Sequence, residues 1–204
     1  MLFAYCTNAQ TYFKPVLPGL DTTVEKQKDI EFMQVKDSTG RILEEGYKKN
    51  KQLDGVYTTY HLTGFPQKTI SYRQGKKNGP TMSFGRDGYL EEYATFKDDI
   101  QHGVYRLYFK GARINKELYF KDGVENGIRK IYYAEGGKQE EANIVSGKRE
   151  GLTTWYYLNG KKATEYHYKN NSIHGKAITY NDKEMITSEG NYANGFEDGF
   201  WKEY

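Results

Sequence analysis

Short runs that read as β-strands fill most of this chain, and glycine, asparagine and aspartate separate them. Residues 55–61 form one such run and residues 67–73 form the next, with enough β-branched and aromatic residues to favour strands over helix. A loop around residues 62–66 would join the two runs, and a turn at residues 74–78 would follow. The pattern therefore predicts a pair of antiparallel strands.

This strand pair recurs with a period of 24 residues. Each unit opens on a glycine: Gly55, Gly79, Gly103, Gly127, Gly151, Gly175 and Gly199. Five residues later comes an aromatic ring: Tyr60, Phe84, Tyr108, Tyr132, Tyr156, Tyr180 or Tyr204. Seventeen residues after the first six glycines comes Tyr72, Phe96, Phe120, Ile144, Tyr168 or Tyr192. Twenty residues after them come types that tolerate a left-handed backbone: Gly75, Asp99, Gly123, Gly147, Asn171 and Gly195.

A period of 24 residues is too short for a helix and a parallel strand, so the repeat predicts an all-β fold. We expect an elongated antiparallel β-meander of stacked hairpins, about 60 Å long if neighbouring strands lie about 4.8 Å apart. Each hairpin would bury its rings only against the hairpins before and after it. The predicted domain spans residues 31–204: a degenerate first unit 31–54, six full units 55–198 and a half unit 199–204.

Residues 1–30 form an amino-terminal extension that we expect to cover one edge of the sheet, because open edges invite aggregation. Its start resembles the tail of a secretory signal, with small residues after an apolar run. Either a full signal begins upstream, or residues 1–6 are an edge-packed or disordered terminus. The first alternative implies a secreted, periplasmic or envelope protein, and the second a cytoplasmic one. Cys6 is read as an inert thiol.

Composition narrows the function classes. The 30 basic and 27 acidic residues nearly balance, which argues against an electrostatic nucleic-acid footprint. One cysteine excludes an internal disulfide framework and a thiolate zinc site. Aromatic residues make up 16% of the chain and include 20 tyrosines, so rings supply much of the buried surface. No apolar stretch approaches the roughly 20 residues that a membrane-spanning helix needs.

Several phrases of the repeat resemble the MORN repeat in its bacterial variant, namely residues 119–127, 157–161 and 189–195. The resemblance covers residues 31–204. Bacterial chains of this type are often described as YwqK-type antitoxins, so the resemblance implies a non-catalytic binding scaffold of stacked hairpins. It implies no cofactor. It also implies a protein partner, which the repeat shape alone does not identify.

The sequence offers little for catalysis or metal binding. His102 and His174 share one repeat position but lie three units apart, too far to share an ion, and His61 and His167 fall at other positions. Four glutamates recur at one position: Glu117, Glu141, Glu165 and Glu189. A uniform ladder lacks the unlike environments that separate a general acid from a base. We expect these carboxylates to accept hydrogen bonds from turn amides or to form ion pairs with lysines such as Lys116 or Lys138. The sequence therefore predicts that the protein is not an enzyme.

One sheet face suggests a binding surface. The recurrent rings five residues after each glycine would lie on one face, which we assign to packing between hairpins. The opposite face turns apolar in units three to five, and the predicted patch there comprises Tyr105, Leu107, Phe109, Ile131, Tyr133, Trp155 and Tyr157. An exposed patch would bind a protein partner, whereas a curled sheet would bury the same rings as packing.

The sequence suggests one further binding site and one alternative function. A partner strand could add at the edge that carries Trp201 and Tyr204. The alternative function is a peripheral membrane or cell-envelope scaffold that binds anionic lipid through lysines, although basic and acidic residues alternate in nearly every unit.

Overall fold

The computed structural model describes residues 11–13, 20–27 and 29–204. The fold is all-β, an open antiparallel meander in which successive strands pair, and none of these residues is helical. The chain divides into two compact units, Met1–Ile100 and Gln101–Tyr204, which we describe separately. Residues 1–10, where the sequence resembles a signal, lie outside the described residues.

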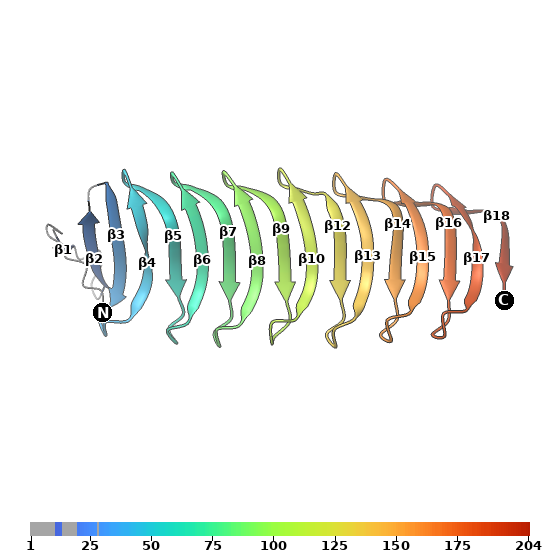
Figure 1. Cartoon of the computed structure of the whole chain (residues 1–204), viewed down its shortest axis with the longest axis horizontal. Coiled ribbons are helices and arrows are strands. Elements are labelled where there is room, and N and C mark those ends of the chain that lie inside the picture. The colour runs from blue at the N-terminus through green and yellow to red at the C-terminus, as the bar shows by residue number, and fades with distance from the viewer. Residues whose placement is uncertain (1–10, 14–19, 28) are drawn as a thin grey trace, which may run out of the picture. The chain divides into compact units, whose positions relative to one another are not determined.

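The first unit holds strands β1 to β8 in chain order (Figure 1). Their bounds are β1 Thr11–Phe13, β2 Leu20–Gln27, β3 Ile30–Asp37, β4 Ile42–Lys49, β5 Gln52–Tyr60, β6 Pro66–Arg73, β7 Lys76–Phe84 and β8 Leu90–Lys97. Each of these strands pairs antiparallel with the next from β1 to β8. Strand β2, from the extension, thereby continues the sheet beyond β3.

The second unit contains strands β9 to β18. Their bounds are β9 Ile100–Tyr108, β10 Ile114–Lys121, β11 Val124–Glu125, β12 Gly127–Tyr132, β13 Lys138–Val145, β14 Lys148–Tyr156, β15 Lys162–Lys169, β16 Ser172–Tyr180, β17 Ile186–Ala193 and β18 Phe196–Glu203. Strand β9 begins at the last residue of the first unit. Strands β10 and β12 pair directly, with the short β11 also paired to β10, and the meander continues to β18.

Tight turns close each hairpin at one end, as at Gln74 and Gly75 between β6 and β7. Both residues have positive φ, 52° and 78°, which is the backbone of the two-residue turn that matches strand twist. All six positions predicted to adopt a left-handed backbone do so. The predicted five-residue turn at 74–78 was too long, because β7 already begins at Lys76.

Six of the seven recurrent glycines lie inside strands rather than at their start, and Gly127 is the first residue of β12. Opposite Ser71, β7 has three residues, 78–80, between the paired positions Lys77 and Thr81. Gly79 sits in this bulge with φ at 107°. A Cβ atom there would lie 3.2 Å from the Ser71 Cβ. Gly79 is therefore explained by both backbone conformation and close approach of the neighbouring strand, whereas at Gly151 and Gly199 only the positive φ applies.

The most closely packed residues form a row across the sheet on the face that holds the second residue after each glycine. In the second unit, Ala142 is paired with Thr153 on β14, and Ala177 lies further along the same row on β16. Their exposed fractions are 1%, 0% and 0%. Close packing is therefore not confined to the face of the recurrent rings, to which the sequence assigned it, although Tyr180 on that face does bond to Glu165 of the hairpin before it.

Candidate interaction surface

Five rings of the second unit form a connected chain, which we name the aromatic band. Its members are Trp155, Tyr166, Tyr168, Tyr192 and Trp201. The ring centroids of Trp155 lie 5.7 Å from Tyr166 and 6.2 Å from Tyr168, and those of Tyr192 and Trp201 lie 5.2 Å apart. Tyr166 and Tyr192, at 6.3 Å, join the two ends. All five rings are half-buried, so each keeps a solvent-facing part.

Small residues create the space in which the band lies. Tyr166 on β15 and Tyr192 on β17 contact each other across β16, where the paired residue is the fully buried Ala177. At Gly190, a Cβ atom would collide with the Trp201 ring. Since rings need these gaps, the band depends on residue size in the row beneath it.

A buried carboxylate fixes one end of the band. Glu140 is 6% exposed and accepts a hydrogen bond from the Trp155 Nε1 at 3.2 Å. The Arg149 Nη2 lies 3.0 Å from the Glu140 Oε1, and its guanidinium sits 5.8 Å from the centre of the Tyr168 ring. Arg129 lies 3.9 Å from the same carboxylate.

Arg129 links this site to a second acid. It binds Glu125 with two hydrogen bonds of 2.8 and 2.6 Å. The bonds to Glu125 raise the pKa of Arg129, burial opposes them, and Glu140 adds to the rise. Two arginines and two glutamates thus form a balanced network that orients the Trp155 indole.

The patch predicted from sequence is not contiguous. On the sheet, Lys116 pairs with both Leu107 and Ile131 and so lies between them. Glu140 likewise lies between Ile131 and Trp155. The prediction considered alternate strands only, and the intervening strands carry the charges that divide it.

The seven predicted patch residues are all half-buried. Several are already engaged within the sheet. The Tyr133 hydroxyl donates to the Tyr156 carbonyl at 2.7 Å, and the Tyr157 hydroxyl donates to the Tyr180 carbonyl at 2.6 Å. Tyr105 lies 5.9 Å from Phe120, ring centre to ring centre. Of these seven residues, only Trp155 belongs to the aromatic band. Trp201, from the predicted edge site, belongs to it as well.

The recurrent glutamates and the rings after each glycine meet on the other face. Tyr180 donates to Glu165 at 2.6 Å, and Tyr204 donates to Glu189 at 2.7 Å. Burial and the hydrogen bond to Glu165 raise the pKa of Tyr180 to about 12. Burial of Glu165 acts to raise its pKa, but its hydrogen bonds to Lys162 and Tyr180 hold the pKa of this carboxyl below its usual value.

Two other glutamates of this ladder form the expected kind of ion pair, with one change of partner. Glu141 pairs with Lys138 at 2.8 Å, as predicted. Glu117 pairs with Arg106 at 2.6 Å rather than with Lys116. The reason is register: Arg106 on β9 lies directly opposite Glu117, whereas Lys116 points to the other face.

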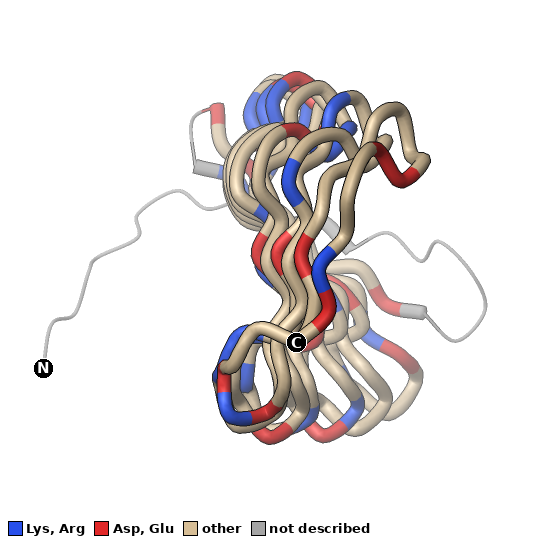
Figure 2. The backbone as a smooth tube through the Cα atoms, turned by 90° about the vertical axis from the view of Figure 1, so that its right-hand side faces the viewer, with Lys and Arg blue, Asp and Glu red and all other residues tan. Residues whose placement is uncertain are grey.

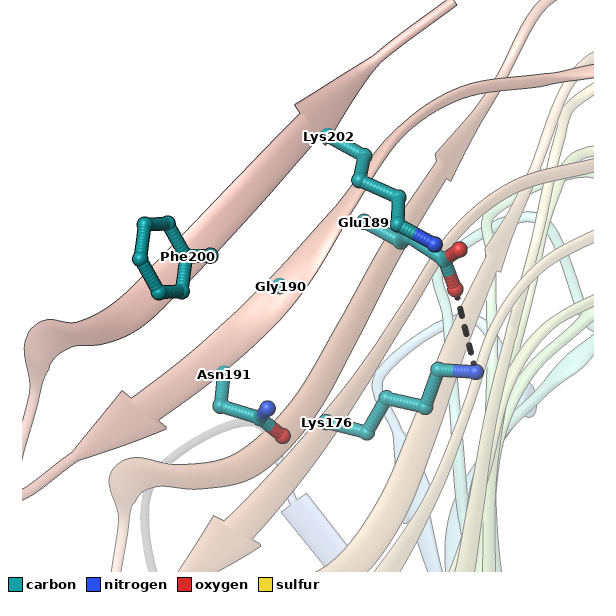
Figure 3. Close-up of a pocket in the computed structure, with 6 residues that line it drawn as sticks. All are labelled: Lys176, Glu189, Gly190, Asn191, Phe200 and Lys202. Carbon is teal, nitrogen blue, oxygen red and sulfur yellow. Dashed lines mark ion pairs between the residues drawn. The ribbon is translucent and has the colours of Figure 1, made fainter.

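A shallow hollow lies beside the band's last strand, lined by Lys176, Glu189, Gly190, Asn191, Phe200 and Lys202 (Figure 3). The Lys176 Nζ and the Glu189 Oε2 lie 3.2 Å apart across it. Phe200 points away from the strand and is 99% exposed. A Cβ atom at Gly190 would meet the Trp201 ring on the band's face, whereas Glu189 and Lys202 lie on the opposite face, so the hollow is separate from the band.

The histidines contact backbone and turns. His61 Nε2 lies 2.8 Å from the Phe84 carbonyl oxygen, and His167 Nδ1 lies 3.1 Å from the Lys176 carbonyl oxygen. His102 and His174 each approach the following turn, at Asp122 and Asn194. Over residues 11–13, 20–27 and 29–204, no group of three His, Cys, Asp or Glu side chains could hold a metal ion.

Sequence reasoning missed Tyr166, Tyr168 and Tyr192 as surface residues. Tyr168 and Tyr192 were noticed only as the ring seventeen residues after a glycine. These rings lie on the second strand of each hairpin and share a sheet face with the residues two and four positions after the glycine, as the pairing of Gly151 with Tyr168 shows. That shared face could have identified them from the sequence.

Scans against protein-family models and against curated proteins returned no match for this chain. Within the described residues, no helix has the length and apolar character to cross a membrane.

Proposed function

We propose that this chain is a non-catalytic scaffold that captures a protein partner on its aromatic band. The observation that carries the proposal is the ring chain from Trp155 to Trp201, half-buried yet held in one arrangement by its neighbours. Tryptophan and tyrosine supply large contact area with few rotatable bonds, and they dominate the energetics of binding sites.

Preorganisation supports the same function. Glu140 holds the Trp155 indole, and the Gly190 gap holds the Trp201 ring, so little side-chain freedom remains to be lost on binding. Charged groups at the rim, such as Arg149, would set the orientation of the partner. The mechanism is stoichiometric masking or scaffolding of the partner, in keeping with the non-catalytic binding scaffold that the resemblance to the MORN repeat implies.

Capture of the protein encoded next to this chain tests the proposal. The tagged full chain is mixed with the purified neighbour, and the bound fraction is measured. Tyr166→Ala and Trp201→Ala should each weaken capture by about tenfold or more, as loss of a central ring does.

Tyr47→Ala is the matched control. Tyr47 is an exposed ring of the first unit, in contact with Phe32 and outside the band. Its removal should leave capture unchanged, and circular dichroism should show that all variants keep their strands. Equal capture by the wild-type and band variants would remove the band as the binding surface.

A further inference from the structure

The hairpin tips of the first unit carry a regular row of basic side chains. Lys49, Arg73 and Lys97 are each the last residue of a strand, in β4, β6 and β8. All three are exposed, and none forms an ion pair with the part of the chain that the structure describes. We name these three side chains the basic row. In Figure 2, basic segments lie at hairpin turns, with acidic segments beside them.

The basic row lines a continuous trough. One surface hollow is lined by Lys49, Asn50 and Arg73 among others, and a second by Arg73, Lys76 and Lys97. The hollows share Arg73 and so meet there. Together their linings hold four basic residues and two acidic ones, Asp54 and Asp98, an excess of two positive charges.

The acidic residues in the trough already accept hydrogen bonds from the sheet. Asp54 Oδ2 accepts from the Gln74 backbone amide at 3.0 Å, and Asp98 Oδ1 accepts from the Asn78 side chain at 3.3 Å. The row itself is spaced by the backbone, because the Gly75 amide donates to the Leu53 carbonyl at 2.8 Å. The trough is therefore a fixed surface with an excess of positive charge.

The spacing of the row selects a ligand. Its members lie on alternate strands, so successive cations are about 9.6 Å apart, twice the strand spacing. A polyproline II chain has three residues per turn and rises about 3.1 Å per residue, which places every third side chain on one face about 9.3 Å apart. Phosphates of a nucleic-acid strand are much more closely spaced.

We propose that this trough binds an acidic, extended protein segment with a carboxylate at every third residue. Each carboxylate would meet one cation, and the Arg73 guanidinium can hold its partner with two parallel hydrogen bonds. Side-chain amides such as those of Asn50 and Gln74 would form hydrogen bonds with the backbone of the segment, which has no internal hydrogen bonds in this conformation. This site is separate from the aromatic band and does not depend on it.

Fluorescence anisotropy with two labelled peptides tests the proposal on the full chain at low salt. One peptide repeats Glu-Pro-Pro four times, and the other has the same composition with its glutamates adjacent. The periodic peptide should bind about tenfold more tightly, and raising the salt should weaken it, because the contacts are ionic.

Matched variants locate the site. Arg73→Glu and Lys97→Glu should each weaken the periodic peptide by about tenfold or more, since reversal adds repulsion. Arg86→Glu makes the same charge change at an exposed loop residue at the opposite end of the hairpins and should change affinity less than about twofold. Circular dichroism verifies that each variant is folded.

Three results would overturn the proposal: equal affinity for both peptides, equal losses in Arg73→Glu and Arg86→Glu, or tighter binding to anionic vesicles or a single-stranded oligonucleotide than to the periodic peptide. Trp201→Ala separates this inference from the proposed function, because it should weaken partner capture and leave peptide binding unchanged.

Discussion

Removing the Glu140 carboxylate is the most informative single perturbation of the second unit. In Glu140→Ala, Arg149 loses its carboxylate partner and the Trp155 Nε1 loses its acceptor. Arg129 still retains Glu125. The variant therefore tests whether the network beneath the band is a source of stability.

The magnitude follows from burial. Breaking a fully buried ion pair costs about 3–5 kcal/mol. The Arg149 side chain is 29% exposed, so water recovers part of that loss. Loss of the indole hydrogen bond adds about 1 kcal/mol. We expect a decrease of about 2–3 kcal/mol in the free energy of unfolding, and about half of that for Glu140→Gln, which keeps an acceptor.

Urea unfolding followed by tryptophan fluorescence measures this loss. The chain has two tryptophans, Trp155 and Trp201, so the signal reports the second unit. Glu135→Gln, at an exposed loop residue of the same unit, is the control and should change the free energy of unfolding by less than about 0.5 kcal/mol. If Glu140→Ala unfolds at the same urea concentration as this control, the network does not stabilise the unit and the reasoning fails.

Three further predictions concern packing, pH and the turns. Gly190→Val should displace the Trp201 ring, seen as a red-shifted tryptophan emission, whereas Ala193→Val on the same strand should leave emission unchanged. The pKa of Tyr180 is about 12 in the folded state and 10 in the unfolded state, so the folded state keeps the hydroxyl proton to higher pH. The contribution of Tyr180 to stability is therefore full below pH 10 and is lost as the pH rises toward 12. In urea unfolding at alkaline pH, Tyr180→Phe should lack this loss of stability. Gly79→Val should lower the melting temperature, since both its positive φ and its contact with β6 oppose a side chain, and a scanning calorimeter that found no change would contradict the bulge assignment.

The strand order and turn positions could be predicted because they depend on local backbone preferences. Glycine and asparagine at positions such as Gly75 and Asn171 select the tight turn directly. Turns in which the positive-φ position holds a residue other than glycine or asparagine were harder to predict. Glu184 and Ala112 adopt positive φ in loops where other units have a glycine, since the surrounding hairpin enforces the conformation.

The candidate surface could be predicted only in part, because it depends on which strands lie between the predicted residues. Trp155 and Trp201 were identified from their repeat positions. The separation of Ile131 from Trp155 by Glu140 needed the strand register, which an even–odd pattern along one strand does not contain. The bulges at recurring glycines such as Gly79 and Gly151 also interrupt the alternation of side chains between the two faces, so an even–odd pattern fails across them.

Six tight turns are joined to the hairpin before them by a main-chain hydrogen bond, as at Gly75 and Leu53, and the Asp54 side chain adds a second bond from Gln74. Side chains that project from strand ends are therefore not required for the geometry that spaces them. Substitutions at such positions can change which molecules a surface attracts while the framework persists. Natural variation could thus change the binding specificity of this protein one hairpin at a time without passing through a misfolded intermediate.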